Sequence, residues 1–290
     1  MLTSLSRPSK LRTFLVLGRV SNLPTVWSDC LAAWCLGGHG EWITLAGAAL
    51  AASFLYVGGM FLNDAFDAEF DRHHRRTRPI PSGAISEREV WQWGSAWLTL
   101  GLVSAAALGP TVVICAAALC ICILLYNAIH KWAPIATILM GMCRLGVYLM
   151  AASAAQHGIS GEVIWKGVAL TAYIAGLSSL ARKENRRVQI NFWPGLLLVT
   201  PIVFAALIDN GPSWMPAVVY SLVLAAWTCW ALSRSLGQAE PNVGYTVSRL
   251  LAGIVLVDLL AVASSSEPWL GCFAIWFALA LLLQRFIPAT

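Results

Sequence analysis

The sequence predicts an all-α fold, namely a polytopic bundle of helices that crosses a membrane. Of its 290 residues, 58% are hydrophobic and only 11% are charged, whereas a soluble domain carries about 25% charged residues. The mean hydropathy is +0.71. The basic residues also gather in short polar loops between long apolar runs. These three observations exclude a soluble enzyme, a nucleic-acid binder and a disordered protein.

Apolar segments follow one another along the whole chain, and each approaches the ~20 residues that a membrane span needs. The predicted spans cover residues 20–38, 42–63, 90–108, 110–127, 134–155, 163–181, 194–209, 214–233, 246–264 and 267–287. Links such as Gly109-Pro110 are short and rich in turn residues, which favours antiparallel neighbours in one bundle. We therefore expect residues 1–290 to form a single integral-membrane domain.

The net charge of +5 is distributed unevenly between the two sets of alternating loops. Lys and Arg fall in the set that holds the N-terminal tail, residues 72–88, 130–131, 182–187 and 234–249, and the Arg285 end. Near the other set the only base is Lys166. Because cytoplasmic loops carry the excess of Lys and Arg, we expect an integral protein of a bacterial inner membrane with both termini in the cytoplasm.

The most informative segment ends the second predicted span. On a helix, Asn63, Asp67 and Asp71 recur every fourth residue, and Asp64 lies one turn before Asp67. This predicts one polar stripe about 12 Å long. Stacked carboxylates repel one another unless cations lie between them, and Mg²⁺ binds carboxylate, water and phosphate oxygens. A solvated helix end is the plainer interpretation, but three Asp and one Asn on one stripe favour a metal–phosphate site.

An arginine-rich loop follows this acidic segment, with Arg72, Arg75, Arg76 and Arg78 before Pro79. Guanidinium groups match phosphate oxygens in geometry, so the loop is a candidate site for a phosphorylated ligand. Alternatively, these bases only keep the loop in the cytoplasm and contact anionic lipid. The neighbouring carboxylates favour the ligand.

These residues resemble the motifs of the UbiA superfamily of intramembrane prenyltransferases. Asn63, Asp64, Asp67 and Asp71 match the first aspartate motif of that family, N-D-x-x-D-x-x-x-D, and residues 78–83 resemble its R-P-[IL]-x-S-G loop. Weaker similarities lie in Arg19 to Asn22 and in Tyr126 with His130-Lys131. The resemblance covers residues 11–263 or so. It implies nine core helices around a central cavity open to the bilayer, so that the bundle would have nine to ten transmembrane helices.

The second aspartate motif of the family, roughly D-x-x-x-D, is altered here. Ala181 and Asn185 stand where its aspartates would be, and the nearby carboxylate is Glu184, flanked by bases. Together with Gly141 to Arg144, this region resembles the EboC-like branch. A cationic helix end can neutralise a diphosphate, but the same change can also mean that the second site and its chemistry are lost.

The resemblance implies a Mg²⁺-dependent transferase that moves an isoprenyl group from a prenyl diphosphate to an acceptor. The acceptor would be an aromatic compound, a hydroxyl compound or a lipid, and the partners would be donor, acceptor and membrane lipid, without nucleic acid. The expected catalytic residues are Asp64, Asp67 and Asp71, and Asn63 joins them as the metal site. The expected diphosphate- or acceptor-binding residues are Asn63, Arg72, Arg78, Lys131, Arg144, Arg182, Lys183, Glu184, Arg19 and Asn22.

Three ionisable residues fall well inside predicted spans: Asp29, Arg144 and Asp258. Such residues are costly in a bilayer and face a partner or a wet cavity. Arg144 is thus a candidate contact for a ligand's phosphate or acceptor group. The structural alternative is an ion pair of Arg144 with Asp258 or Asp29.

Other functions remain open at this point. Residues 181–187 are compatible with a non-catalytic binder of prenyl diphosphate or lipid. The three buried ionisable residues are compatible with a transporter, although no inverted repeat with broken helices supports it. A membrane terpene cyclase would use the same ionisation. Product formation separates the enzymes from the binder, and counterflow in liposomes identifies the transporter.

Overall fold

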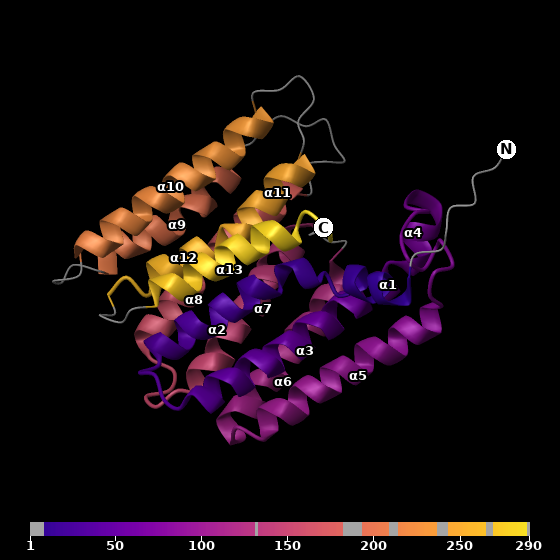
Figure 1. Ribbon diagram of the computed structural model, residues 1–290, viewed down its shortest axis with the longest axis horizontal. Coiled ribbons are helices and arrows are strands. Elements are labelled where there is room, and N and C mark those ends of the chain that lie inside the picture. Colours follow the sequence, from indigo (N-terminus) through magenta and orange to yellow (C-terminus); the bar gives the residue numbers. More distant parts are fainter. Residues whose placement is uncertain are drawn as a thin grey trace.

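The protein is an elongated bundle of helices that lie side by side in the computed structural model (Figure 1). The structure describes residues 9–130, 133–181, 193–208, 214–236, 243–264 and 269–288. Within these ranges the chain is helical apart from short turns, and it contains no strand. The predicted all-α class is therefore confirmed.

Long helices coincide with the predicted apolar segments. They are α2 (Leu23–Leu36), α3 (Trp42–Phe66), α5 (Glu87–Ala106), α6 (Pro110–Ile129), α7 (Ala133–Ser153), α8 (Gly161–Ala181), α9 (Trp193–Ile208), α10 (Trp214–Leu236), the pair α11 (Val243–Ala252) and α12 (Ile254–Ala261), and α13 (Leu270–Leu283). Short elements precede or interrupt them: α1 (Lys10–Leu17), η1 (Val20–Asn22) and α4 (Ala68–His74).

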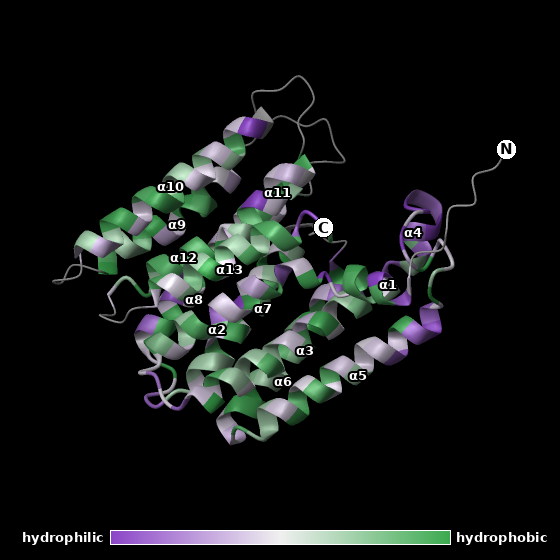
Figure 2. Ribbon diagram, viewed as in Figure 1, coloured by the Kyte–Doolittle hydropathy of each residue, from purple (hydrophilic) through white to green (hydrophobic). Residues whose placement is uncertain are grey.

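Membrane insertion follows from the length and the outer surface of these helices. Six helical segments are long and apolar enough to cross a membrane, among them α3, α6 and the joined α11–α12. Large apolar side chains lie on the outside, such as Leu196, which is 72% exposed, and Ile43, which is 70% exposed. Hydrophobic residues run along the helices, whereas α4 and the start of α5 are hydrophilic (Figure 2). The chain is an integral membrane protein; a total of nine to ten crossings, the central cavity and the single domain stay predictions.

Glycines bring α3 close to its neighbours. A Cβ on Gly58 would lie 2.9 Å from the backbone nitrogen of Leu98 on α5, and one on Gly59 would lie 2.9 Å from Cγ2 of Ile123 on α6. Small residues allow this approach between membrane helices. As a result, the end of α3 lies beside the end of α6.

Turns that the structure describes lie at two opposite ends of the bundle. At one end, the amide of Gln156 donates to the carbonyl of His39 at 2.7 Å, and Ser264 donates to Glu162 at 3.1 Å. At the other end lie α1, the end of α3 and α4 (Figure 1), and the end of α6 lies beside them, since Asn127 is hydrogen-bonded to Asn63. We call this second end the acidic end, because the segment from Asn63 to Asp71 lies there.

Candidate active site

The acidic segment begins on α3 and continues past a break in the helix. Helix α3 ends at Phe66, Asp67 lies in a turn, and α4 begins at Ala68 and turns away from α3 (Figure 1). The backbone amide of Asp67 donates to the backbone carbonyl of Asn63 at 3.0 Å, and the backbone amide of Asp71 donates to the backbone carbonyl of Asp67 at 2.9 Å. The four-residue spacing is thus kept, but the prediction of one straight helical stripe is wrong, because the axis changes at Asp67.

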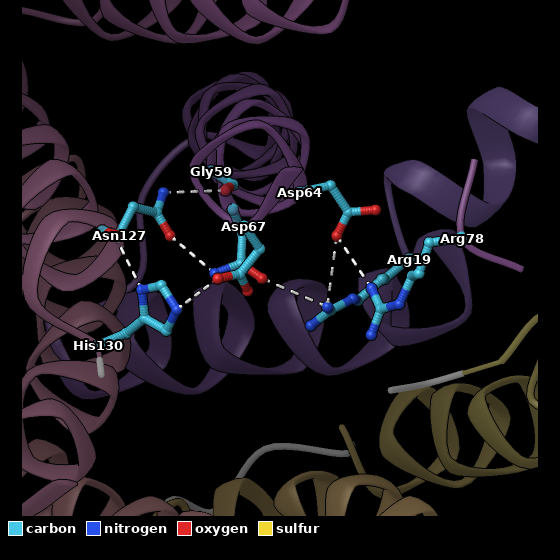
Figure 3. Close-up of polar contacts among 8 residues, drawn as sticks. Arg19, Gly59, Asp64, Asp67, Arg78, Asn127 and His130 are labelled. Carbon is cyan, nitrogen blue, oxygen red and sulfur yellow. Dashed lines mark hydrogen bonds and ion pairs between the residues drawn. The ribbon is translucent and has the colours of Figure 1, made fainter. Parts of the chain in front are cut away.

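Asp64 is held by two arginines from other segments. Its Oδ1 accepts from Nη1 of Arg78 at 3.0 Å and lies 3.8 Å from Nη2 of Arg19 (Figure 3). The residue is only 5% exposed. A buried carboxylate needs such partners, because removing its charge from water is costly. The structure thereby brings three predicted site residues together.

Arg19 reaches the site from an unusual backbone conformation. It lies between α1 and η1 with φ of 42° and ψ of 47°, in the left-handed region. Residues other than glycine adopt this region at a cost of about 1–2 kcal/mol. Its guanidinium also donates to Oδ1 of Asn63 at 3.4 Å. Asn22, three residues later, is buried just before α2, and its amide donates to the Arg19 carbonyl at 3.0 Å.

Asn127 on α6 and His130 just after it complete the polar network, and neither is among the site residues expected from the sequence. Asn127 accepts from Nδ2 of Asn63 and donates to the carbonyl of Gly59, both at 3.1 Å. Nε2 of His130 lies 2.9 Å from Oδ1 of Asp67, and its Nδ1 lies 2.8 Å from the Asn127 carbonyl (Figure 3). The sequence feature that could have identified them is an Asn and a His three residues apart at the end of an apolar span, because polar side chains within a membrane have a high free-energy cost.

Asp71 lies on α4 and is 2% exposed. Its Oδ1 is buried and has no hydrogen-bond partner among the residues that the structure describes. Burial raises the pKa of this carboxyl above its ordinary value, although Arg78 and Arg75 oppose the shift. A cation at this oxygen would satisfy a group that the protein leaves unsatisfied.

Other predicted residues lie apart from the carboxylates. Arg72 pairs with Glu87 at the start of α5 at 2.5 Å and is half exposed. Arg144 is buried among α2 and α7 and pairs with Asp29. Four further candidates fall outside the described residues: Lys131, Arg182, Lys183 and Glu184.

Comparison with known proteins assigns the fold and the family. The sequence profile of the UbiA prenyltransferase family matches residues 21–247. The chain belongs to the UbiA prenyltransferase family. The EboC-like subgroup stays a prediction.

The named relatives include two kinds of prenyltransferase. Digeranylgeranylglyceryl phosphate synthase of Methanopyrus kandleri is 27% identical over 264 residues, which cover 88% of this chain and 90% of that relative. The 4-hydroxybenzoate octaprenyltransferase of Paracidovorax citrulli is 38% identical over 106 residues, or 33% of this chain and 36% of that relative. The match to the synthase of Ignicoccus hospitalis likewise spans only 33% of that relative.

Solved UbiA structures share the arrangement of helices. A structure of digeranylgeranylglyceryl phosphate synthase in membranes has a TM-score of 0.60 at 20% identity and covers 88% of this chain and 98% of that chain. A UbiA homolog from Archaeoglobus fulgidus, bound to GPP and Mg²⁺, has a TM-score of 0.53 at 17% identity. The match covers 94% of this chain and 99% of that chain. At these identities the likeness establishes the fold.

The UbiA family implies a magnesium ion, and the residues of the acidic segment fit it in donor chemistry. Carboxylate and amide oxygens are the hard ligands that Mg²⁺ takes, and the unsatisfied Oδ1 of Asp71 is such an oxygen. Within the described part of the chain, however, no three acidic, His or Cys side chains converge on one point. Arg19, Arg78 and His130 hold the carboxylates instead.

Proposed function

We propose that this protein is a Mg²⁺-dependent intramembrane prenyltransferase that moves an isoprenyl group from a prenyl diphosphate to an acceptor. The observation that carries the proposal is the pairing of Asp64 with Arg19 and Arg78 beside Asp67 and Asp71 at the end of α3. Carboxylates suit a divalent cation and guanidinium groups suit phosphate oxygens, so one site provides both halves of a metal–diphosphate complex.

The named relatives support the class of reaction and the choice of donor. One relative is a 4-hydroxybenzoate octaprenyltransferase and another is a digeranylgeranylglyceryl phosphate synthase. A UbiA homolog of the same fold was solved with GPP and Mg²⁺. For this chain we leave the acceptor as a lipophilic or small molecule, because these two relatives differ in acceptor.

Each residue of the site has a role in the proposed reaction. Arg19 and Arg78 bind the diphosphate and neutralise the charge that develops as the bond between C1 of the prenyl chain and oxygen breaks. Asp64, Asp67, Asp71 and Asn63 are the proposed ion ligands, and the ion, when bound, supplies Lewis acidity for the leaving group. The acceptor forms the new bond to C1 and loses its proton, while the diphosphate leaves with the electron pair of the broken C1–O bond and serves as the base for that proton.

Residues outside the described ranges extend this proposal. We extend the assignment to Lys131, Arg182, Lys183 and Glu184, which we propose to bind the diphosphate end of the donor, because their positions in the sequence resemble the ends of the family's motif-bearing spans. Here the bases would take over part of the role of the missing second pair of aspartates. The acidic end then faces the cytoplasm of a bacterial inner membrane, as the positive-inside distribution of Lys and Arg favours.

A release assay tests the proposal. Purified protein in nanodiscs receives geranyl, farnesyl or geranylgeranyl diphosphate, with Mg²⁺ or with a chelator, and with or without a cell lipid extract as acceptor source. Diphosphate release that needs both Mg²⁺ and the extract supports the transferase. Release without the extract indicates cyclisation or hydrolysis. Saturable binding without release contradicts the proposal and identifies a binder, as expected if the altered region at 181–187 has abolished turnover.

A further inference from the structure

A cluster of charged and hydroxyl side chains lies inside the bundle, away from the acidic segment. It joins Asp29 on α2, Arg144 on α7 and Asp258 on α12. Asp29 and Asp258 are completely buried, and Arg144 is 9% exposed. Charges at this depth persist only when they are paired and hydrogen-bonded.

Arg144 identifies Asp29 as the ionised carboxylate of the cluster. Its Nη1 donates to Oδ2 of Asp29. Its Nη2 donates to Oγ1 of Thr25 at 2.9 Å, and the guanidinium carbon lies 5.9 Å from the ring centre of Tyr56. The one guanidinium therefore balances one carboxylate.

Two hydroxyl groups are the hydrogen-bond partners of Asp258. Tyr148 on α7 donates to Oδ1 of Asp258 at 2.5 Å. Ser28 on α2 donates to Oδ2, and its hydroxyl is also 3.0 Å from the carbonyl of Thr25. Each oxygen of Asp258 thus has a neutral partner, and none of the ion pairs among the described residues includes Asp258.

The charges of the cluster decide which carboxyl group is protonated. The charge of Asp29 is balanced by Arg144, whereas the hydroxyl partners of Asp258 carry no charge. A buried carboxyl group without a counter-charge takes up a proton instead of staying ionised. The proton therefore belongs to Asp258.

We infer that Asp258 is a neutral carboxylic acid within the membrane-spanning bundle, and that its hydrogen bonds with Ser28 and Tyr148 join α12 to α2 and α7 beside the Asp29–Arg144 ion pair. Two ionised carboxylates and one guanidinium would leave a net negative charge in a fully buried site, at a high desolvation cost. With one proton the cluster is neutral. Asp258 acts as a positioning residue, because it contacts Ser28 and Tyr148 and no expected substrate group.

The cluster also connects to the proposed active site through the start of α2. The hydroxyl of Thr25 donates to the carbonyl of Asn22 at 2.7 Å, and the amide of Asn22 donates to the carbonyl of Arg19 at 3.0 Å. The ion pair thereby fixes the turn that presents Arg19 to Asp64. This connection rests on the proposed function, whereas the protonation of Asp258 does not.

Infrared spectroscopy tests the protonation state without any assay of activity. Protein labelled with ¹³C-aspartate is purified in a detergent without ester groups and measured at neutral pH. We expect the wild-type-minus-Asp258→Asn difference spectrum to contain the C=O stretching band of a protonated aspartic acid. The exposed Glu41 gives a matched control, so Glu41→Gln should leave that band unchanged.

Paired variants determine which carboxyl carries the proton. Asn resembles a protonated Asp in shape and donates a hydrogen bond, so Asp258→Asn should melt at the wild-type temperature and keep wild-type diphosphate release. Asp29→Asn leaves Arg144 without its counter-charge and should lower the melting temperature. The inference is overturned if the band is absent from the wild type, if it survives Asp258→Asn, or if Asp29→Asn is the tolerated variant. If neither wild type nor variant releases diphosphate, the proposed function fails while the infrared result still stands.

Discussion

At the scale of single residues, His130 connects α6 to the acidic segment. Its ring lies 2.9 Å from Asp67 and is anchored by the carbonyl of Asn127 at 2.8 Å. Groups that orient a metal ligand contribute about 10–100-fold to metal affinity or activity. We therefore expect His130→Gln to reduce Mg²⁺-dependent turnover by a factor in this range, measured as diphosphate release against Mg²⁺ concentration. The control is His73→Gln, because His73 is exposed on α4; equal losses in the two variants would contradict the role of His130.

Arg78 and Arg76 form a second matched pair within one loop. Arg78 contacts Asp64 at 3.0 Å, whereas Arg76 is exposed. A hydrogen bond to a charged group contributes about 1.5–3 kcal/mol. We predict that Arg78→Gln raises the KM for prenyl diphosphate about tenfold or more and that Arg76→Gln changes it little. A uniform effect of both changes would instead indicate general attraction by the charge of the loop.

The site residues of the acidic segment could be predicted from the sequence, but the residues that contact them could not. The spacing of Asn63, Asp64, Asp67 and Asp71 is visible in one stretch of sequence. The partner of Asp67, His130, follows the end of a helix that is distant in sequence, and a single sequence does not give such contacts. For Arg144 the sequence left a ligand contact and an ion pair open, and the structure shows the ion pair with Asp29.

At the scale of helices, the packing of α3 against α5 sets the position of the site. A Cβ at Gly58 would meet the backbone of α5, 2.9 Å from the nitrogen of Leu98 and 3.0 Å from the carbonyl of Gly94. Overpacking of this kind costs about 1–3 kcal/mol. Gly58→Ala should lower the melting temperature in detergent and reduce activity, because α3 must move at the end that carries Asn63 and Asp64.

Gly271 on α13 provides the control for this change. A Cβ there meets no atom within 4 Å, so Gly271→Ala should leave the melting temperature unchanged or raise it slightly, as removal of a helical glycine does. Equal destabilisation by Gly58→Ala and Gly271→Ala would show that backbone preference, and not helix contact, determines the effect.

The positions of the helices were predictable from hydropathy, whereas two local features near the site were not. Long apolar runs determine where membrane helices lie, since the bilayer requires internally satisfied backbone groups. The break at Asp67 and the left-handed backbone of Arg19 depend on contacts between α3, α6 and η1. The hydropathy pattern and the helix propensity of a short segment do not reveal such contacts between distant segments.

At the scale of the whole molecule, the two ends of the bundle should face different compartments. Arg76 lies at the acidic end and Gln156 at the opposite end, and both are exposed. We expect a membrane-impermeant thiol reagent, added to intact spheroplasts, to label Gln156→Cys and to spare Arg76→Cys in a variant without the eight native cysteines. Permeabilised cells control for reactivity. Labelling of Arg76→Cys from outside would reverse the orientation.

The central claim is that the acidic segment performs prenyl transfer, and product formation by Asp67→Asn tests it most directly. Glu69→Gln is the matched control, because Glu69 is an exposed carboxylate on α4 close to Asp67. Both variants and the wild type are incubated with prenyl diphosphate, Mg²⁺ and lipid extract, and the prenylated product is measured by mass spectrometry. We predict product from the wild type and Glu69→Gln and none from Asp67→Asn at an unchanged melting temperature. Wild-type product formation by Asp67→Asn would contradict the claim.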